Sequence, residues 1–173
     1  MKNVKKIMSI TVLGIALFSV ISCKNEPKKV EKQEVAAADI KQSNPEFKDT
    51  IVAATFQHYL HLKTALVKTD AVDAKKGAEM IANTTENPEI KALATQIASE
   101  SDIEKQRKLF SDLTTVLKPI LVTSLSSGEI YEQNCPMALN GGANWFAIEK
   151  QINNPYYGDQ MLHCGLVQET LKL

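Results

Sequence analysis

The sequence predicts an all-α fold, in which an antiparallel four-helix bundle carries a loop-rich C-terminal segment packed against it. Three observations support this prediction. The length of 173 residues suits one domain. Only 6% of the residues are aromatic, whereas the helix-forming residues Ala, Leu, Lys and Glu are common. Between residues 44 and 121, apolar residues recur in four stretches at steps of three and four, which is the spacing of one helix face.

Residues 1–22 have the pattern of an export signal and are set aside from the fold. Three lysines among the first six residues precede an uncharged run over 7–21, which is too short to span a membrane. The run ends at Ser22 and Cys23 and resembles the lipobox of a bacterial lipoprotein, in a relaxed form with Val20 in the usual place of Leu. This resemblance implies cleavage before Cys23, lipidation of that cysteine, and a lipid-anchored position in the cell envelope facing the periplasm. An ordinary secretory signal with an incidental cysteine is the alternative.

Residues 23–43 follow as a predicted flexible tether. They mix both charges and contain almost no large apolar side chain, so they cannot bury enough surface to order themselves. The folded domain is therefore expected over residues 44–173.

The first helix is expected to begin at Asn44, which would cap it, with Pro45 and Glu46 in its first turn. It should end near Thr69. Its predicted inner face consists of Phe47, Ile51, Ala54, His58, Leu62 and Ala65, widened by Phe56, Tyr59, Leu60 and Leu66.

Three further helices have start signals of their own. Asp70 is expected to cap the second helix and Asn87 the third, and residues 101–104 have the pattern of a capping box for the fourth. Pro119 should kink the fourth helix or end it near Lys118.

The net charge and the absence of known catalytic motifs argue against two classes of function, nucleic-acid binding and catalysis. Lys+Arg and Asp+Glu both number 20, and this lack of basic excess argues against binding to nucleic acid. The sequence contains no GxSxG, Walker A, HExxH or GxGxxG motif. We therefore expect a binding protein rather than an enzyme.

The segment from about residue 128 differs from the helical part. It holds five of the seven glycines, the only tryptophan and two of the three cysteines. A loop-rich segment without an apolar stripe needs something besides packing to hold it, and the two cysteines are the obvious candidates.

Five side chains in this segment could bind a metal ion: Cys135, Met137, Met161, His163 and Cys164. Thiolate and thioether sulfur prefer soft ions, above all Cu(I), and imidazole accepts either copper state. Gly165 would permit a tight turn beside Cys164. A subset of the five could offer one ion two or three sulfurs, with or without the imidazole.

A disulfide between Cys135 and Cys164 is the competing interpretation, because an exported protein meets oxidising conditions. It would close a loop of about 30 residues and stabilise the fold by about 3–4 kcal/mol. Met137, Met161 and His163 would then be ordinary loop residues, or would bind copper beside an oxidised pair.

Two weaker candidates remain. His58 and His61 are three residues apart on the first helix, but zinc enzymes usually space their histidines by four, and His58 falls on the inner face. Trp145, Tyr156 and Tyr157 could shield a Cu(I) site by cation–π contact, although packing beneath the C-terminal segment explains them equally well.

Several motifs together resemble one family. They are Tyr59–Lys63 with Ala65 and Leu66, Asp102–Arg107 with Phe110, Cys135–Ala138, Trp145, Asn154–Gly158, Met161 with Leu162, and Cys164 with Gly165. Over about residues 48–171 the chain is identified as a member of the domain-of-unknown-function family thirty-three forty-seven. Such domains occur alone in envelope lipoproteins and fused to periplasmic adaptor subunits of copper/silver efflux pumps.

The resemblance implies a protein that binds copper or another soft metal ion and buffers it or passes it to an efflux adaptor. Cys135-Pro136-Met137 is also similar to the start of a short heavy-metal-binding module that ends in CxxCGM. Here residues 161–165 read MLHCG, which departs from that ending and leaves the ligand set open. The alternative function is a disulfide-stapled protein-interaction module without a metal.

Overall fold

The computed structural model describes residues 44–173, so the predicted signal peptide, the tether and Cys23 lie outside the described residues. The helices are α1 (Thr50–Val67), α2 (Ala71–Thr84), α3 (Pro88–Ser99) and α4 (Ile103–Ser124). The strands are β1 (Glu46–Phe47), β2 (Leu125–Ser127), β3 (Ile130–Cys135), β4 (Ala143–Ala147) and β5 (Leu166–Leu171). The four helices were expected, but the all-α prediction is wrong, because the strands form two antiparallel sheets.

Local capping signals predicted two helix starts correctly. The Asp70 side chain accepts hydrogen bonds from two backbone N–H groups of α2, and the Asn87 side chain does the same for α3. At the start of α4 the cap is Asp102, whereas the expected capping box is replaced by Glu100, whose carboxylate accepts from two backbone N–H groups ahead of the helix. Pro119 does not end α4, which continues to Ser124.

The start of α1 is a second correction. The helix begins at Thr50 under an Asp49 cap, and Glu46 and Phe47 form a strand instead of a first turn. Glu46 pairs with Ser127 across an antiparallel ladder, and its carboxylate accepts a hydrogen bond from the Ser127 hydroxyl. Pairing with a segment far along the chain has overridden the local helix-start signal.

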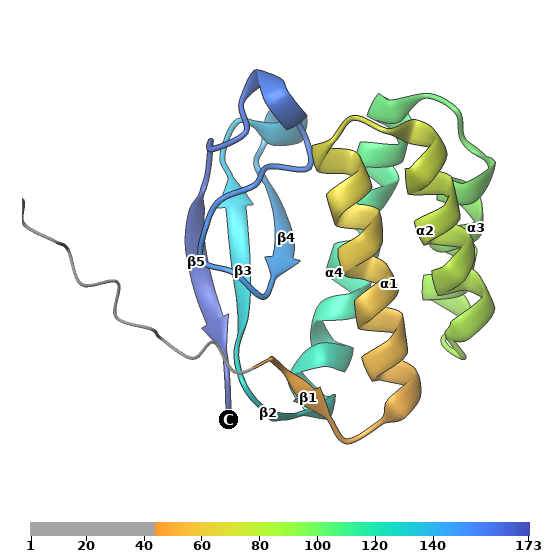
Figure 1. Ribbon diagram of the computed structural model, residues 1–173, viewed down its shortest axis with the longest axis vertical. Helices are drawn as coiled ribbons and strands as arrows, with labels where there is room; N and C mark the ends of the chain where they lie inside the picture. Colours follow the sequence, from red (N-terminus) through yellow and green to blue (C-terminus); the bar gives the residue numbers. More distant parts are fainter. Residues whose placement is uncertain (1–43) are drawn as a thin grey trace, which may run out of the picture. The chain divides into compact units, whose positions relative to one another are not determined.

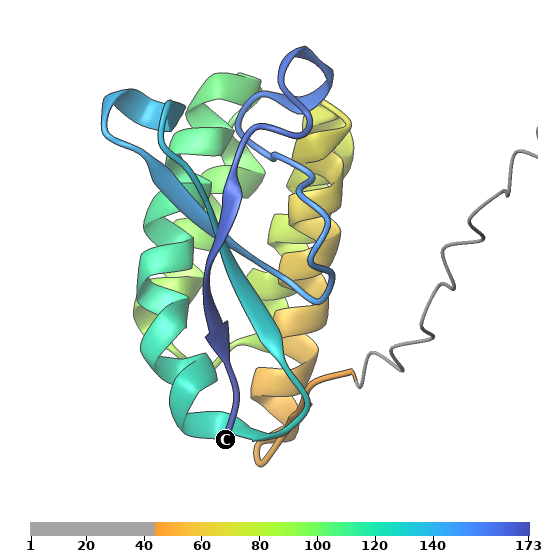
Figure 2. The ribbon, with the colours of Figure 1, turned by 90° about the vertical axis from the view of Figure 1, so that its left-hand side faces the viewer.

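The described part has three layers (Figure 1). The sheet β4-β3-β5 forms one layer, α1 and α4 form the middle layer, and α2 and α3 lie on the far side. Figure 2, turned by 90°, shows the face of the sheet that points away from the helices, with its strands crossing in front of α4 and α1. The C-terminal segment is loop-rich and packs on the helices as expected, but it also contains this three-stranded sheet.

Strand β3 explains why this sheet was missed. It lies between two partners and is almost entirely buried, polar residues included, so it lacks the alternation of an ordinary amphipathic strand. Its Glu132 is 2% exposed and binds the Lys118 ammonium and the Asn144 amide. Its Gln133 is fully buried and donates to two backbone carbonyls beyond β4. The Glu132 carboxylate and the Gln133 amide N–H groups are paired by contacts that the sequence does not reveal, whereas the Gln133 side-chain oxygen has no described partner.

Tyr59 joins the helices to the sheet. Its hydroxyl is 2.8 Å from the Thr114 hydroxyl on α4 and accepts a hydrogen bond from the Phe146 N–H on β4 at 3.1 Å. Its ring stacks on Phe110 at a centroid distance of 5.0 Å. Burial raises the pKa of Tyr59 far above its ordinary value, so the hydroxyl stays neutral and keeps both contacts.

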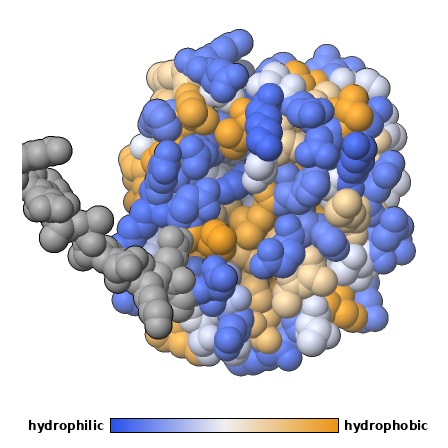
Figure 3. Space-filling model, in the orientation of Figure 1, coloured by the Kyte–Doolittle hydropathy of each residue, from blue (hydrophilic) through white to orange (hydrophobic). Residues whose placement is uncertain are grey.

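The surface in Figure 3 is mostly hydrophilic, with a group of hydrophobic residues exposed near the middle of this face. Among the helices of residues 44–173, none combines the length and the apolar character needed to cross a membrane.

Removing the Tyr59 hydroxyl should destabilise the fold. We expect Tyr59→Phe to lower the free energy of unfolding by about 2 kcal/mol, because the buried Phe146 N–H loses its partner. Tyr131→Phe is the matched control, since that hydroxyl only donates to the half-buried carboxylate of Glu129, and it should cost about 0.5 kcal/mol. Urea unfolding of both variants measures the difference. Equal losses would show that Tyr59 does not have this role.

Candidate functional site

The two cysteines of the C-terminal segment meet at one point. Cys135 ends β3, and Cys164 lies two residues before β5, the strand that pairs with β3. Their sulfur atoms are 3.5 Å apart, and both are free thiols. Cys135 is buried and Cys164 is half-buried, so the pair can be approached from the Cys164 side.

Asn154 and Gly165 hold Cys164 in place. The fully buried Asn154 side chain donates to the Cys164 carbonyl at 2.8 Å and accepts from the Tyr156 N–H at 2.8 Å. Gly165 has φ +147°, and a Cβ there would lie 2.8 Å from the Asn134 carbonyl oxygen. Only glycine lets the chain pass this close to β3.

Cys135 affects the protonation of the Cys164 thiol. The pKa of the Cys164 thiol lies above its ordinary value, first because it shares a hydrogen bond with Cys135 and then because of burial. At neutral pH the Cys164 thiol therefore keeps its proton, and an ion that binds this sulfur must displace it.

The other predicted ligands lie around this pair in turns. Met137 is 50% exposed, and its carbonyl accepts a hydrogen bond from the Tyr157 hydroxyl. Met161 is half-buried in a turn in which the Cys164 N–H donates to its carbonyl at 3.0 Å. In the described contacts, no hydrogen bond or ion pair joins the side chain of Met137 or Met161 to either sulfur.

His163 is exposed, and its Nδ1 is 2.8 Å from the Ile152 carbonyl. Because a carbonyl only accepts, Nδ1 carries the proton and leaves the Nε2 lone pair free. Within residues 44–173, no three side chains of His, Cys, Asp or Glu gather into a possible metal site. The two cysteines and His163 are thus not gathered in this way, and Met137 and Met161 are the other soft donors of the segment.

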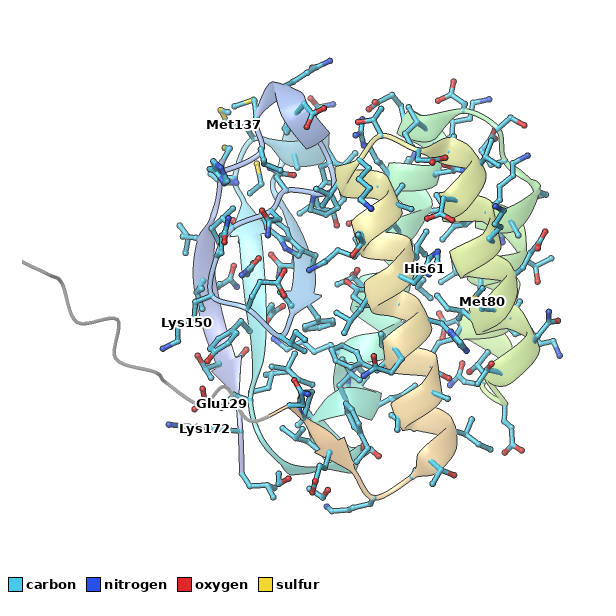
Figure 4. The ribbon with its side chains drawn as sticks, in the orientation of Figure 1. His61, Met80, Glu129, Met137, Lys150 and Lys172 are labelled. Atoms are coloured by element: carbon cyan, nitrogen blue, oxygen red, sulfur yellow. The ribbon has the colours of Figure 1, made fainter. Side chains whose placement is uncertain are left out.

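The turn after Cys135 has a strained backbone. Leu139 and Asn140 have φ of 51° and 60°, values that residues other than glycine adopt at a cost. The turn leaves Leu139 43% exposed beside the half-exposed Met137. Figure 4 places Met137 at the end of the sheet where β3 finishes. An apolar, sulfur-bearing loop is thus presented next to the thiol pair.

The two histidines of α1 and the aromatic residues, which were the weaker candidates for a metal site, make other contacts. His61 points to α2, where its Nε2 is 3.2 Å from an Asp73 oxygen (Figure 4), and His58 is half-buried. Trp145 is fully buried and packs edge-on against Tyr156 at 6.0 Å. These buried aromatic rings therefore belong to the hydrophobic core beneath the C-terminal segment.

Residues 55–128 match the family model described as "Protein of unknown function (DUF3347)". This match supports the resemblance to the family over that segment. No curated protein and no solved structure matches the chain. The matched DUF3347 residues run from α1 to the turn after β2, so the sulfur pair lies beyond them, although the resemblance was expected over 48–171.

The DUF3347 segment nevertheless positions the sulfur-bearing segment. Three of its buried side chains reach residues beyond 128: Tyr59 binds the Phe146 N–H, Lys63 pairs with Glu149, and Arg107 donates to the Pro155 carbonyl. From the sequence, Tyr59 was expected on the inner face of the first helix, whereas Lys63 and Arg107 were noticed only as parts of motifs.

Asn154 is the functional residue that sequence reasoning missed. It appeared in the motif Asn154–Gly158, but no role was expected for it. Its buried amide fixes the backbone of Cys164, so it acts as a positioning residue for the pair.

A side chain at Gly165 should separate the thiols. We expect Gly165→Ala to lower the free energy of unfolding by about 2 kcal/mol and to slow cross-linking of Cys135 to Cys164, because the new Cβ collides with β3. Gly141→Ala is the control, since a Cβ there meets nothing within 4 Å. The yield of disulfide after mild oxidation measures the effect. Identical yields in both variants would contradict this role of Gly165.

Proposed function

We propose that this chain is an envelope lipoprotein that binds copper or another soft metal ion through Cys135 and Cys164, and buffers it or passes it to an efflux system. The observation that carries the proposal is the 3.5 Å separation of two free thiol sulfurs from segments 29 residues apart. Thiolate sulfur prefers Cu(I) over the hard ions Mg²⁺ and Ca²⁺.

The spacing of the sulfurs suits a shared ion. Two sulfurs that each lie about 2.3 Å from a tetrahedral ion are about 3.8 Å apart. The observed 3.5 Å is within a few tenths of an ångström of that value. A disulfide requires a separation of about 2.05 Å, so the sulfurs would have to approach by about 1.5 Å.

Methionine would complete the ligand set. Met137 follows Cys135 after one residue, and Met161 lies in the same turn as Cys164, so either thioether could supply a third soft donor. His163 remains the weakest of the proposed ligands, although its free Nε2 faces no described hydrogen-bond partner.

The proposed location and partner rest on the sequence. The lipobox-like residues before Cys23 support a lipid anchor in the envelope, on the inner or the outer membrane. The half-buried Cys164 and the exposed Met137 would let an acceptor protein, such as an efflux adaptor, reach the ion.

Cu(I) titration of the reduced full-length protein against a competing chelator tests the proposal. We expect Cys135→Ser/Cys164→Ser to weaken binding by more than about 100-fold, because it removes both thiolates. Met137→Leu should weaken binding about tenfold, whereas Met80→Leu should not change it, since Met80 is 40% exposed on α2 and distant from the pair. If the double variant binds Cu(I) as tightly as the parent, the thiol site does not exist.

A disulfide-stapled interaction module is the second candidate. The same pair of sulfurs favours it, and exposed Met137, Leu139 and Leu166 lie around or after the two cysteines as apolar contact points. In this case the pair would stabilise the C-terminal sheet instead of binding an ion.

Counting the thiols of protein purified without reductant separates the two candidates. Two free thiols are expected for the metal site and none for the staple, because Cys23 is lipidated in both proposals. For the staple, reduction should lower the free energy of unfolding by about 3–4 kcal/mol. The Cys135→Ser/Cys164→Ser variant should then show no further loss on reduction.

A further inference from the structure

A cavity of about 270 Å³ lies at the other end of the helical layers from the thiol pair. It is bounded by the start of α1, the connection between α2 and α3, and the second half of α4. An enclosed apolar cavity of about 150 Å³ already holds benzene, so this one has room for a ring and a short side chain. Its apolar lining residues are Ile51, Val52, Ile90, Leu117 and Ile120.

Thr55 supplies an unpartnered polar atom to this cavity. It is 3% exposed, lines the cavity, and its hydroxyl has no hydrogen-bond partner. By contrast, the hydroxyls of Thr64, Thr95 and Thr114 each donate to the carbonyl four residues earlier in their helix. An unsatisfied buried hydroxyl costs free energy unless a bound molecule pairs with it.

The mouth of the cavity is acidic. Asp49 and Glu86 are exposed and line it, and none of the lining residues is basic. One oxygen of Asp49 accepts from the N–H groups of Ile51 and Val52, which leaves its second oxygen without a described partner. The amide of Asn87 caps α3 at the same rim. Two carboxylates and no cation favour a positively charged ligand group.

We infer that this cavity binds a small organic ammonium ion with a short hydrocarbon body and a hydroxyl group. The ammonium lies at the mouth between Asp49 and Glu86, the hydrocarbon contacts the apolar walls, and the hydroxyl bonds to Thr55. This inference is independent of the metal site, because none of its residues contacts either cysteine.

Calorimetric titration of the full-length protein in a non-ionic detergent tests it with three probes. Tyramine carries both polar groups, phenethylamine lacks the hydroxyl, and 4-ethylphenol lacks the ammonium. Tyramine should bind in a saturable manner, and each of the other two should bind about two- to tenfold more weakly. No saturable binding of tyramine, or equal binding of all three probes, would overturn the inference.

Three variants locate the binding. Thr55→Val keeps the side-chain shape and should reduce tyramine affinity about two- to tenfold without affecting phenethylamine. Asp49→Asn, which keeps the helix cap, and Glu86→Gln should each reduce it about two- to fivefold. Asp112→Asn removes an exposed charge from the surface of α4 and should change nothing. If Thr55→Val leaves tyramine affinity unchanged, water alone satisfies the hydroxyl and the site is not the one inferred.

Discussion

The structure depends on buried polar contacts that join the helices to one another and to the C-terminal segment. The Tyr59 hydroxyl binds the Phe146 N–H, and the Arg107 guanidinium donates to the carbonyls of Leu66 and Pro155. Each contact links residues more than 40 positions apart in the sequence. Because a buried donor that loses its partner costs more than the bond contributes, these contacts specify one position of the sheet on the helices.

That fixed position determines the geometry of the thiol pair. Cys135 is held by β3, which lies between two partners and is buried against the helices. Cys164 is outside regular structure and depends on the Asn154 amide and the close approach at Gly165. One sulfur thus belongs to a rigid strand, and the other belongs to a turn held by a few contacts. The turn is the part that can adjust by the tenths of an ångström that an ion requires.

Local sequence signals predicted the helices, whereas the strands depend on contacts between residues far apart in the sequence and were not predicted. Asp70 and Asn87 cap helices through bonds two or three residues away, so the sequence contains the whole interaction. The Asn44 signal failed because β1 pairs with a strand about 80 residues later. Strand β3 was missed because Glu132 and Gln133 are buried only with partners from other elements. The sequence could predict that Cys135 and Cys164 lie close together, because a shared metal ion and a disulfide both require it. It could not predict the turns that place Met137, Met161 and His163.

The two proposals for the thiol pair exclude each other, because both use the same electrons on the same atoms. A disulfide has no thiolate left to bind an ion, and an ion held by both sulfurs blocks their oxidation. At the proposed envelope location, thiols 3.5 Å apart would stay reduced only while something competes with oxidation. Occupancy by a soft metal ion is such a competitor. The state of this pair in the cell therefore reports on whether the two thiolates bind a metal ion.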